Sequence, residues 1–228
     1  MKKYKIIVSI TGKNAKECIA KIDEADNLRL PELALFLERL EVGDREQVYA
    51  RLERSGIKGI PLVHLRSDMD GSELRMLAAK YRVKYFTIHE DHFNIIENWR
   101  GFQKKLFLEM STDDYVAPNV KVETIGGFCV DLAHYKKQSI LVNKDYRYIY
   151  ERRDKPRLFA CNHLSGYSHK LKSDLHLVVS EADFDYLAEL PSFVFGNLLA
   201  MEIDNPLRDQ IRYRDYALAI FERLNKSK

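Results

Sequence analysis

Several features that would narrow the class of this protein are missing from its sequence. No run of about 18 apolar residues exists, so we expect no membrane-spanning segment. The apolar run at residues 6–8 follows N-terminal lysines but is too short for a signal peptide. Only three of the 228 residues are cysteines, and no two of them have CxxC spacing. This excludes a disulfide framework and favours a reduced, cytoplasmic protein.

An excess of charge of one sign is missing as well. The chain has 37 Lys and Arg against 34 Asp and Glu, a formal net charge of +3, and no long basic run. This balance does not indicate a nucleic-acid-binding protein, although it allows a phosphorylated ligand. No stretch rich in Gly, Pro and Ser divides the chain, so we predict a single domain over residues 1–228.

Short apolar runs alternate along the chain with segments of helical periodicity. We expect eight strands at residues 5–10, 33–37, 60–65, 85–88, 105–108, 128–132, 157–161 and 198–201. The expected helices are 14–26, 44–54, 72–81, 93–102, 181–190 and 205 onward, with 138–151 a helix or loop and 165–174 a polar basic loop. This alternation predicts a parallel sheet, and eight units predict a (β/α)8 TIM barrel.

Histidines and carboxylates stand where these expected strands end. In residues 129–135 a strand runs into Asp131, and His134 follows three residues later. The other such residues are His64, His89, Glu109, His163 and Glu202, with Asp174 and His176 in the loop after the seventh strand. A single residue of this kind is usually an ordinary hydrogen-bonded side chain. Because the strand ends of a β/α barrel converge on one face, their joint placement predicts a site for a divalent transition metal.

Four short motifs carry a resemblance to a known superfamily. Residues 128–134 are similar to the Leu-Asp-x-x-His strand of the xylose-isomerase-like metal-dependent barrels, which include sugar isomerases, epimerases and endonuclease IV. Residues 162–165 resemble the His-Leu-Asn strand end of that superfamily, residues 173–176 its Asp-x-His, and residues 200–202 its final glutamate. The resemblance extends over residues 60–205.

The resemblance implies a set of metal ligands. Endonuclease IV enzymes bind three metal ions through nine ligands, and every position has a candidate here: His64, His89, Glu109, Asp131, His134, His163, Asp174, His176 and Glu202. Isomerases and epimerases need only the subset Glu109, Asp131, His163 and Glu202. The expected cofactor is therefore a divalent metal, most simply Zn²⁺ or Mn²⁺.

Three functions remain open. The full ligand set favours metal-assisted phosphoester hydrolysis. The alternative is a sugar or sugar-phosphate isomerase or epimerase in which the catalytic residues Glu109 and Glu202 pass a proton between neighbouring carbons. A barrel that only binds a metabolite is the third possibility.

The chain also departs from the superfamily pattern. Gly166 follows Ser165 where an aspartate usually stands, and the chain is shorter than the DNA-cleaving members. Glu123 competes with Glu109 for the fifth-strand position, but only eight residues separate Glu123 from Asp131, too few for a β/α crossover.

Substrate-binding candidates are the cations near the expected metals. Arg66 lies two residues after His64, and His169, Lys170 and Lys172 lie in the basic loop. A solvated loop explains the last three slightly better than phosphate binding does, and Arg66 has the same two interpretations. We therefore expect a small phosphorylated or sugar-like substrate and only weak binding of duplex DNA.

Overall fold

The computed structural model describes residues 3–226. One parallel sheet holds nine strands in the order β1-β11-β8-β7-β6-β5-β4-β3-β2. Their bounds are β1 Lys5–Ile7, β2 Ser9–Ile10, β3 Ala34–Phe36, β4 Leu62–His64, β5 Tyr85–His89, β6 Leu106–Glu109, β7 Gly127–Asp131, β8 Phe159–Leu164 and β11 Leu198–Met201. The expectation of an α/β fold with a parallel barrel is confirmed at this level.

The two ends of the sheet order belong to neighbouring pieces of the chain. Strands β1 and β2 are separated by Val8 alone, and the sequence had suggested one strand over residues 5–10. The structure divides this run because its two halves have different partners: Ile7 pairs with Ala200 of β11, whereas Ser9 pairs with Ala34 of β3. This change of partner brings the edges of the sheet together into a nearly closed barrel.

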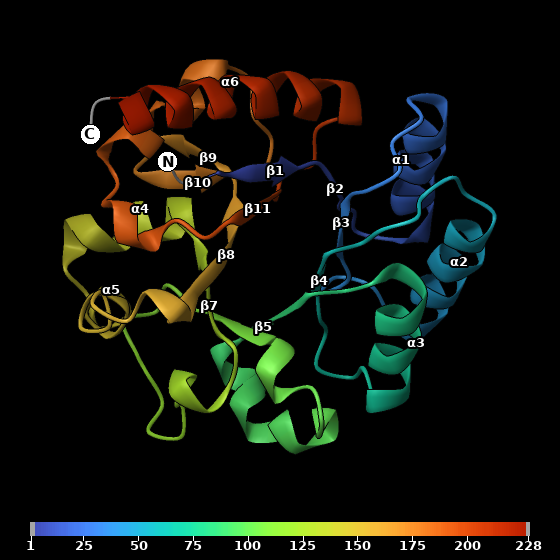
Figure 1. Cartoon of the computed structure of the whole chain (residues 1–228), viewed down its shortest axis with the longest axis horizontal. Coiled ribbons are helices and arrows are strands. Elements are labelled where there is room, and N and C mark those ends of the chain that lie inside the picture. The colour runs from blue at the N-terminus through green and yellow to red at the C-terminus, as the bar shows by residue number, and fades with distance from the viewer. Residues whose placement is uncertain (1–2, 227–228) are drawn as a thin grey trace.

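Helices surround the ring of strands. In Figure 1, α1, α2 and α3 lie on one side of the ring, α4 and α5 on the opposite side, and α6 across the top. Their bounds are α1 Ala15–Asn27, α2 Val42–Glu53, α3 Gly71–Tyr81, α4 Leu132–Leu141, α5 Lys144–Tyr150 and α6 Leu207–Lys226. None of the helices within residues 3–226 has the length and apolar character that crossing a bilayer requires.

Several connections are less regular than the sequence pattern suggested. The 3₁₀ helices are η1 Glu90–Trp99, η2 Gln103–Lys105, η3 Val122–Thr124, η4 Pro156–Leu158, η5 Glu181–Glu189 and η6 Ser192–Val194. The helices expected at residues 93–102 and 181–190 are thus η1 and η5, and Ser180 caps η5 as predicted. Residues 138–151 belong to two helices, because Val142 adopts a left-handed conformation and Asn143 caps α5.

The expected basic loop at residues 165–174 is largely an antiparallel hairpin. Its strands are β9 Gly166–Ser168 and β10 Ser173–Leu175, and Asp174 pairs with Tyr167 across it. The sequence pattern missed the hairpin because each strand has only three residues.

Side chains alternate between two apolar layers along the barrel strands. Val63, Leu108, Val130 and Leu199 belong to the large core shared with the helices. The second, smaller cluster comprises Ile7, Ala34, Phe36, Leu62, Phe107, Cys129, Cys161, Leu198 and Ala200. Because side chains two residues apart lie on the same face of a strand, this second cluster forms the barrel interior. A residue two positions after the last interior member of its strand therefore lies on the same face, closer to the mouth of the barrel.

The start of β7 depends on glycine. Gly127 has φ +134°, and a Cβ built there would lie 2.4 Å from the carbonyl oxygen of Leu158. We predict that Gly127→Ala lowers the free energy of unfolding by about 1–3 kcal/mol, through backbone strain and displacement of the neighbouring chain. Gly43→Ala in α2 is the matched control, since its Cβ would meet nothing within 4 Å. Urea unfolding of both variants measures the difference, and equal stabilities would contradict the prediction.

Candidate metal centre

The structure brings all nine sequence-predicted ligands to the mouth of the barrel. Five of them stand two residues after a member of the interior cluster: His64 after Leu62, Glu109 after Phe107, Asp131 after Cys129, His163 after Cys161 and Glu202 after Ala200. His89 ends β5, His134 lies in α4, and Asp174 and His176 lie in and just after β10. We call these nine residues the Glu109 cluster.

The carboxylate of Glu109 lies at the centre of this cluster. Its Oε2 is 3.0 Å from Nε2 of His64, 3.0 Å from Nδ1 of His163 and 3.5 Å from Nε2 of His89. Its Oε1 is 3.7 Å from Nδ1 of His134. One buried carboxylate therefore faces four imidazoles, which come from β4, β5, β8 and α4.

Two groups of potential ligands share Glu109. In one, a ligand atom from each of His64, His89 and Glu109 lies within 4.8 Å of the others. In the other, the same is true of Glu109, Asp131, His163 and Glu202. Several His, Asp and Glu groups could thus hold a metal ion, and Glu109 could contact two such ions.

The hairpin adds a further carboxylate beside the centre. Oδ2 of Asp174 lies 3.2 Å from Nε2 of His176 and 3.8 Å from Nε2 of His134. Since His134 also faces Glu109, it joins the hairpin residues to the barrel residues.

The Asp-x-x-His spacing has a local explanation. Asp131 is the N-cap of α4, and its Oδ1 accepts a hydrogen bond of 2.7 Å from the backbone N–H of His134. An N-cap side chain reaches the third helical residue in this way, so the cap fixes both side chains at the strand end. Oδ2 of Asp131 is buried and has no hydrogen-bond partner.

The outer nitrogens of two histidines are fixed by main-chain carbonyl groups. Nδ1 of His64 lies 3.1 Å from the carbonyl oxygen of Leu65, and Nδ1 of His176 lies 3.0 Å from that of Glu202. A carbonyl oxygen only accepts, so Nδ1 carries the hydrogen in both rings. In a neutral ring, Nε2 then presents a lone pair to Glu109 or Asp174. Two facing lone pairs repel unless a proton or a metal ion lies between them.

This arrangement fits a divalent transition metal. Metal-bound histidines commonly donate their outer N–H to a carbonyl or carboxylate, which sets the tautomer and aims the inner nitrogen at the ion. Oδ2 of Asp131 is buried without a hydrogen bond, and the buried Oε2 of Glu202 lies 3.1 Å from Nδ1 of His163, so both carboxylates add oxygens to the same space. Imidazole combined with carboxylate suits zinc, manganese, iron and cobalt.

The electrostatics of the metal-free cluster favour protonated histidines beside ionised carboxylates. Burial opposes protonation of His89 and His134, but Glu109 and Asp131 outweigh it and raise the pKa values to about 9 and about 10. The hydrogen bond to Asp174 raises the pKa of His176 to about 9. Burial raises the pKa of Asp131 to about 6. A metal ion would have to displace protons from these imidazoles.

Two residues at the mouth were not predicted from the sequence. Glu38 directly follows the strand expected at residues 33–37, so the search for carboxylates at strand ends could have found it. Its Oε2 is buried without a hydrogen bond and lies 3.9 Å from Nδ1 of His64. His92, in η1, forms a further potential ligand group with His89 and Asp91. Glu38 and His92 line a hollow of about 340 Å³ together with Leu65, Arg66, Ser67 and His89.

The predicted substrate-binding cations lie in different surroundings. Arg66 lines this hollow, but it forms ion pairs with Glu41 at 2.6 Å and Asp68 at 3.4 Å. His169 is exposed and lies 3.5 Å from Glu189, and Lys170 and Lys172 are exposed between β9 and β10. The structure thus places only Arg66 at the hollow, and a role for the other three remains a prediction.

Glu123, the competitor of Glu109, lies outside the cluster. It forms ion pairs with Arg152 at 2.9 Å and Lys155 at 3.1 Å. The choice of Glu109 as the residue at the end of the fifth predicted strand agrees with the observed end of β6.

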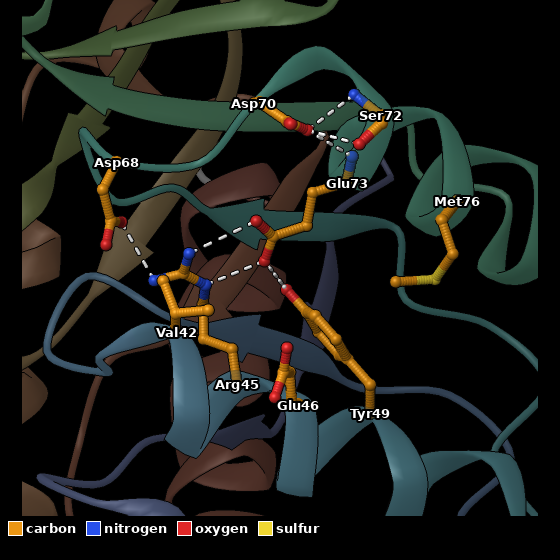
Figure 2. A pocket seen from close by; sticks show the side chains of 9 residues that line it. All are labelled: Val42, Arg45, Glu46, Tyr49, Asp68, Asp70, Ser72, Glu73 and Met76. Carbon is orange, nitrogen blue, oxygen red and sulfur yellow. Dashed lines mark hydrogen bonds and ion pairs between the residues drawn. The ribbon is translucent and has the colours of Figure 1, made fainter.

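A second hollow, of about 380 Å³, lies between α2 and α3. Figure 2 shows Arg45 of α2 reaching toward Glu73 and Asp68, with Tyr49 directed at the same glutamate. Arg45 donates to Glu73 at 2.8 Å and to Asp68 at 2.9 Å, and Tyr49 donates to Glu73. Since these side chains already pair with one another, we interpret their contacts as structural ones that hold α2 against α3.

The raised histidine pKa values predict a pH dependence. Stabilisation from His89, His134 and His176 is complete below the unfolded pKa of about 6.5 and is lost as pH rises through about 9 to 10. Metal affinity should rise over the same range, and metal binding at pH 7 should release protons. Calorimetric titration with Zn²⁺ in two buffers of different ionisation enthalpy measures this release.

Asp174→Asn should reduce the number of protons released, because Asp174 holds the proton on His176. Glu123→Gln, on the surface away from the cluster, is the control and should leave it unchanged. Heats that do not depend on the buffer would contradict the prediction.

Comparison with known proteins does not assign the chain. No family model matches it, and no curated protein matches its sequence. The function must therefore be argued from the geometry of the Glu109 cluster.

Proposed function

We propose that this protein is a metal-dependent hydrolase of phosphoesters, built on a TIM barrel of the xylose-isomerase-like type. The observation that carries the proposal is the position of Glu109, whose carboxylate is shared by two groups of potential ligands. A shared carboxylate is the feature that lets two ions act on one phosphoryl group. The first group adds His64 and His89 to Glu109, and a single-ion isomerase does not need these two histidines.

Bound divalent ions would polarise a phosphoryl oxygen and lower the pKa of a bound water. The chain's own residues hold the ligands in place for this chemistry. Leu65 and Glu202 orient His64 and His176 through their carbonyl groups, and Thr87 contacts Nε2 of His163 at 3.2 Å. Phe36 packs beneath His163 with ring centroids 5.0 Å apart. The inner nitrogens are thereby preorganised, which reduces the cost of rearrangement on binding.

The substrate is small. A volume of about 340 Å³ lies near the lower end of the roughly 300–1,000 Å³ range of ligand pockets. Arg66 supplies one cation, partly neutralised by Glu41 and Asp68, and the carboxylate of Glu38 lines the same hollow. One phosphate beside a sugar-like group suits this lining better than an extended polyanion does. The metal of choice is Zn²⁺ or Mn²⁺, since the five histidines among the nine candidate ligands suit Zn²⁺ and the four carboxylates suit Mn²⁺.

A second function is favoured by one specific observation. Glu109, Asp131, His163 and Glu202 form a four-residue group with all ligand atoms within 4.8 Å. This group alone would suffice for a single-ion sugar isomerase or epimerase, in which Glu109 and Glu202 move the proton. The two proposals differ in whether His64 and His89 hold an ion of their own.

Metal content separates the two functions. We predict that the purified protein binds more than one divalent ion, and that His89→Asn removes one ion while Glu202→Gln removes another. Hydrolysis of sugar phosphates or of a chromogenic phosphodiester should fall about a hundredfold or more in either variant, since loss of supporting residues alone costs about 10–100-fold. Elemental analysis and steady-state kinetics measure the two effects.

Glu123→Gln serves as the control because it replaces a carboxylate outside the cluster. An unchanged metal content in His89→Asn would reject the multi-ion hydrolase and favour the isomerase. Absence of metal in the wild-type protein, together with metabolite binding, would leave only a non-catalytic barrel.

Duplex DNA provides a further test. Three of the predicted phosphate-binding cations lie outside the hollow, and one of them, His169, is near Glu189. Within residues 3–226, Lys170 and Lys172 are exposed and form no ion pair, so these two predicted cations can neutralise only a few phosphates. We predict weak duplex binding that falls steeply with salt, and Lys170→Ala with Lys172→Ala should weaken it further. Fluorescence anisotropy with an abasic duplex measures binding, and gel analysis measures incision. Efficient incision at physiological salt would contradict a small substrate.

A further inference from the structure

A second set of carboxylates lies apart from the substrate hollow. Glu90 begins η1 directly after β5, Asp113 lies in the segment after β6, and Asp145 lies in the first turn of α5. One oxygen from each residue lies within 4.8 Å of the other two. We call these three residues the Asp145 site.

Two of the three carboxylates are almost completely buried. Glu90 is 6% exposed and Asp145 is 0% exposed, whereas Asp113 reaches the surface. Oδ2 of Asp145 accepts hydrogen bonds from the backbone N–H of Asp114 at 3.1 Å and from Nδ2 of Asn143 at 2.9 Å. Oδ1 of Asp145 and Oε2 of Glu90 have no hydrogen-bond partner. Buried polar atoms are rarely left in this state, because an unpaired oxygen loses its hydration without compensation.

No basic side chain balances these carboxylates. Within residues 3–226, no Lys or Arg forms an ion pair with Glu90, Asp113 or Asp145. Burial raises the pKa of Asp145 to about 6, and the nearby charges of Asp113 and Asp114 act in the same direction. The three like charges therefore need either a bound cation or a proton shared between Glu90 and Asp145.

We propose that the Asp145 site binds a hard divalent cation, with Ca²⁺ the best match. All donors at the site are oxygens, which Ca²⁺ and Mg²⁺ prefer, and no imidazole belongs to the group. The donors come from three irregularly spaced segments, and Ca²⁺ tolerates such geometry better than the strictly octahedral Mg²⁺ does. Asp113, at the surface, gives the ion a route of entry.

The cation would connect three segments of the chain, adding to the hydrogen bond that already joins Asp114 to Asp145. Glu90 is the neighbour of His89, and Asp113 follows Glu109 by four residues, so both segments also carry members of the Glu109 cluster. No α-helix connects β6 to β7, and Nε2 of Gln138 in α4 donates to the carbonyl oxygen of Ser111 in this stretch. A bound ion would fix the segment after β6 against α5 and η1. Cation binding itself does not depend on the proposed hydrolysis.

Equilibrium dialysis with radioactive Ca²⁺ tests the proposal on the full chain saturated with Zn²⁺, so that the Glu109 cluster is occupied. The wild-type protein should bind one Ca²⁺, and Asp145→Asn should abolish this binding. Asp113→Asn, at an exposed position where the amide oxygen of Asn can still accept the hydrogen bond from the backbone N–H of Tyr115, should weaken it by about tenfold or more through loss of one charged ligand. Thermal unfolding with and without Ca²⁺ should show stabilisation only in proteins that bind the ion.

Two control variants make the outcome decisive. Asp154→Asn removes an exposed carboxylate elsewhere, and Glu202→Gln damages the Glu109 cluster, and both should still bind Ca²⁺. Loss of Ca²⁺ in Glu202→Gln with retention in Asp113→Asn would place the ion in the Glu109 cluster and overturn the proposal. Absence of Ca²⁺ and Mg²⁺ binding to the folded wild-type protein would also overturn it and indicate a shared proton.

Discussion

The buried carboxylate of Glu109 is the group on which the mouth of the barrel depends. It is 3% exposed, and an isolated carboxylate at such a position would lose hydration that the protein interior cannot replace. Burial alone would raise its pKa, but His163, His64 and His89 outweigh burial and hold the pKa well below its usual value. Glu109 in turn raises the pKa values of His163 and His89 and so favours their charged forms. The charged carboxylate and the charged imidazoles therefore stabilise one another, and a bound divalent ion would supply the positive charge in place of protons on the imidazoles.

The alternation of side chains in the strands makes the cluster a consequence of the barrel. Ligands at the ends of β4, β6, β7, β8 and β11 each follow an interior residue by two positions, so the packing that fills the barrel also aims the ligands. A slip of one residue in any strand would turn its ligand toward the helices and an apolar residue toward the mouth. The register pairs seen between β5 and β6, where His89 stands opposite Glu109, are thus part of the site.

Much of this arrangement could be predicted from the sequence, because strand positions and strand-end residues are local patterns. The strands ending at His64, Glu109 and Asp131 agree with the expected ones to within a few residues. Pairing was harder to predict. The division at Val8 depends on contacts with β3 and β11, and the hairpin that carries Asp174 depends on pairing across three-residue strands. Glu38 also follows a strand, as the predicted ligands do, but it belongs to none of the motifs that resemble the superfamily.

The Glu109 cluster and the Asp145 site lie close in the sequence but differ in the chemical type of their ligands. His89 and Glu90 are neighbours, yet His89 faces Glu109 at 3.5 Å, while Glu90 groups with Asp113 and Asp145. The Glu109 cluster combines imidazole with carboxylate and suits a transition metal, whereas the Asp145 site has oxygen donors alone and suits a hard cation. Because β5 ends between them, an ion at either site would restrict the same backbone. If both sites bind their ions, order imposed at the oxygen site would reduce the entropy that the histidine site loses on binding its own metal, and the coupling would be equal in both directions.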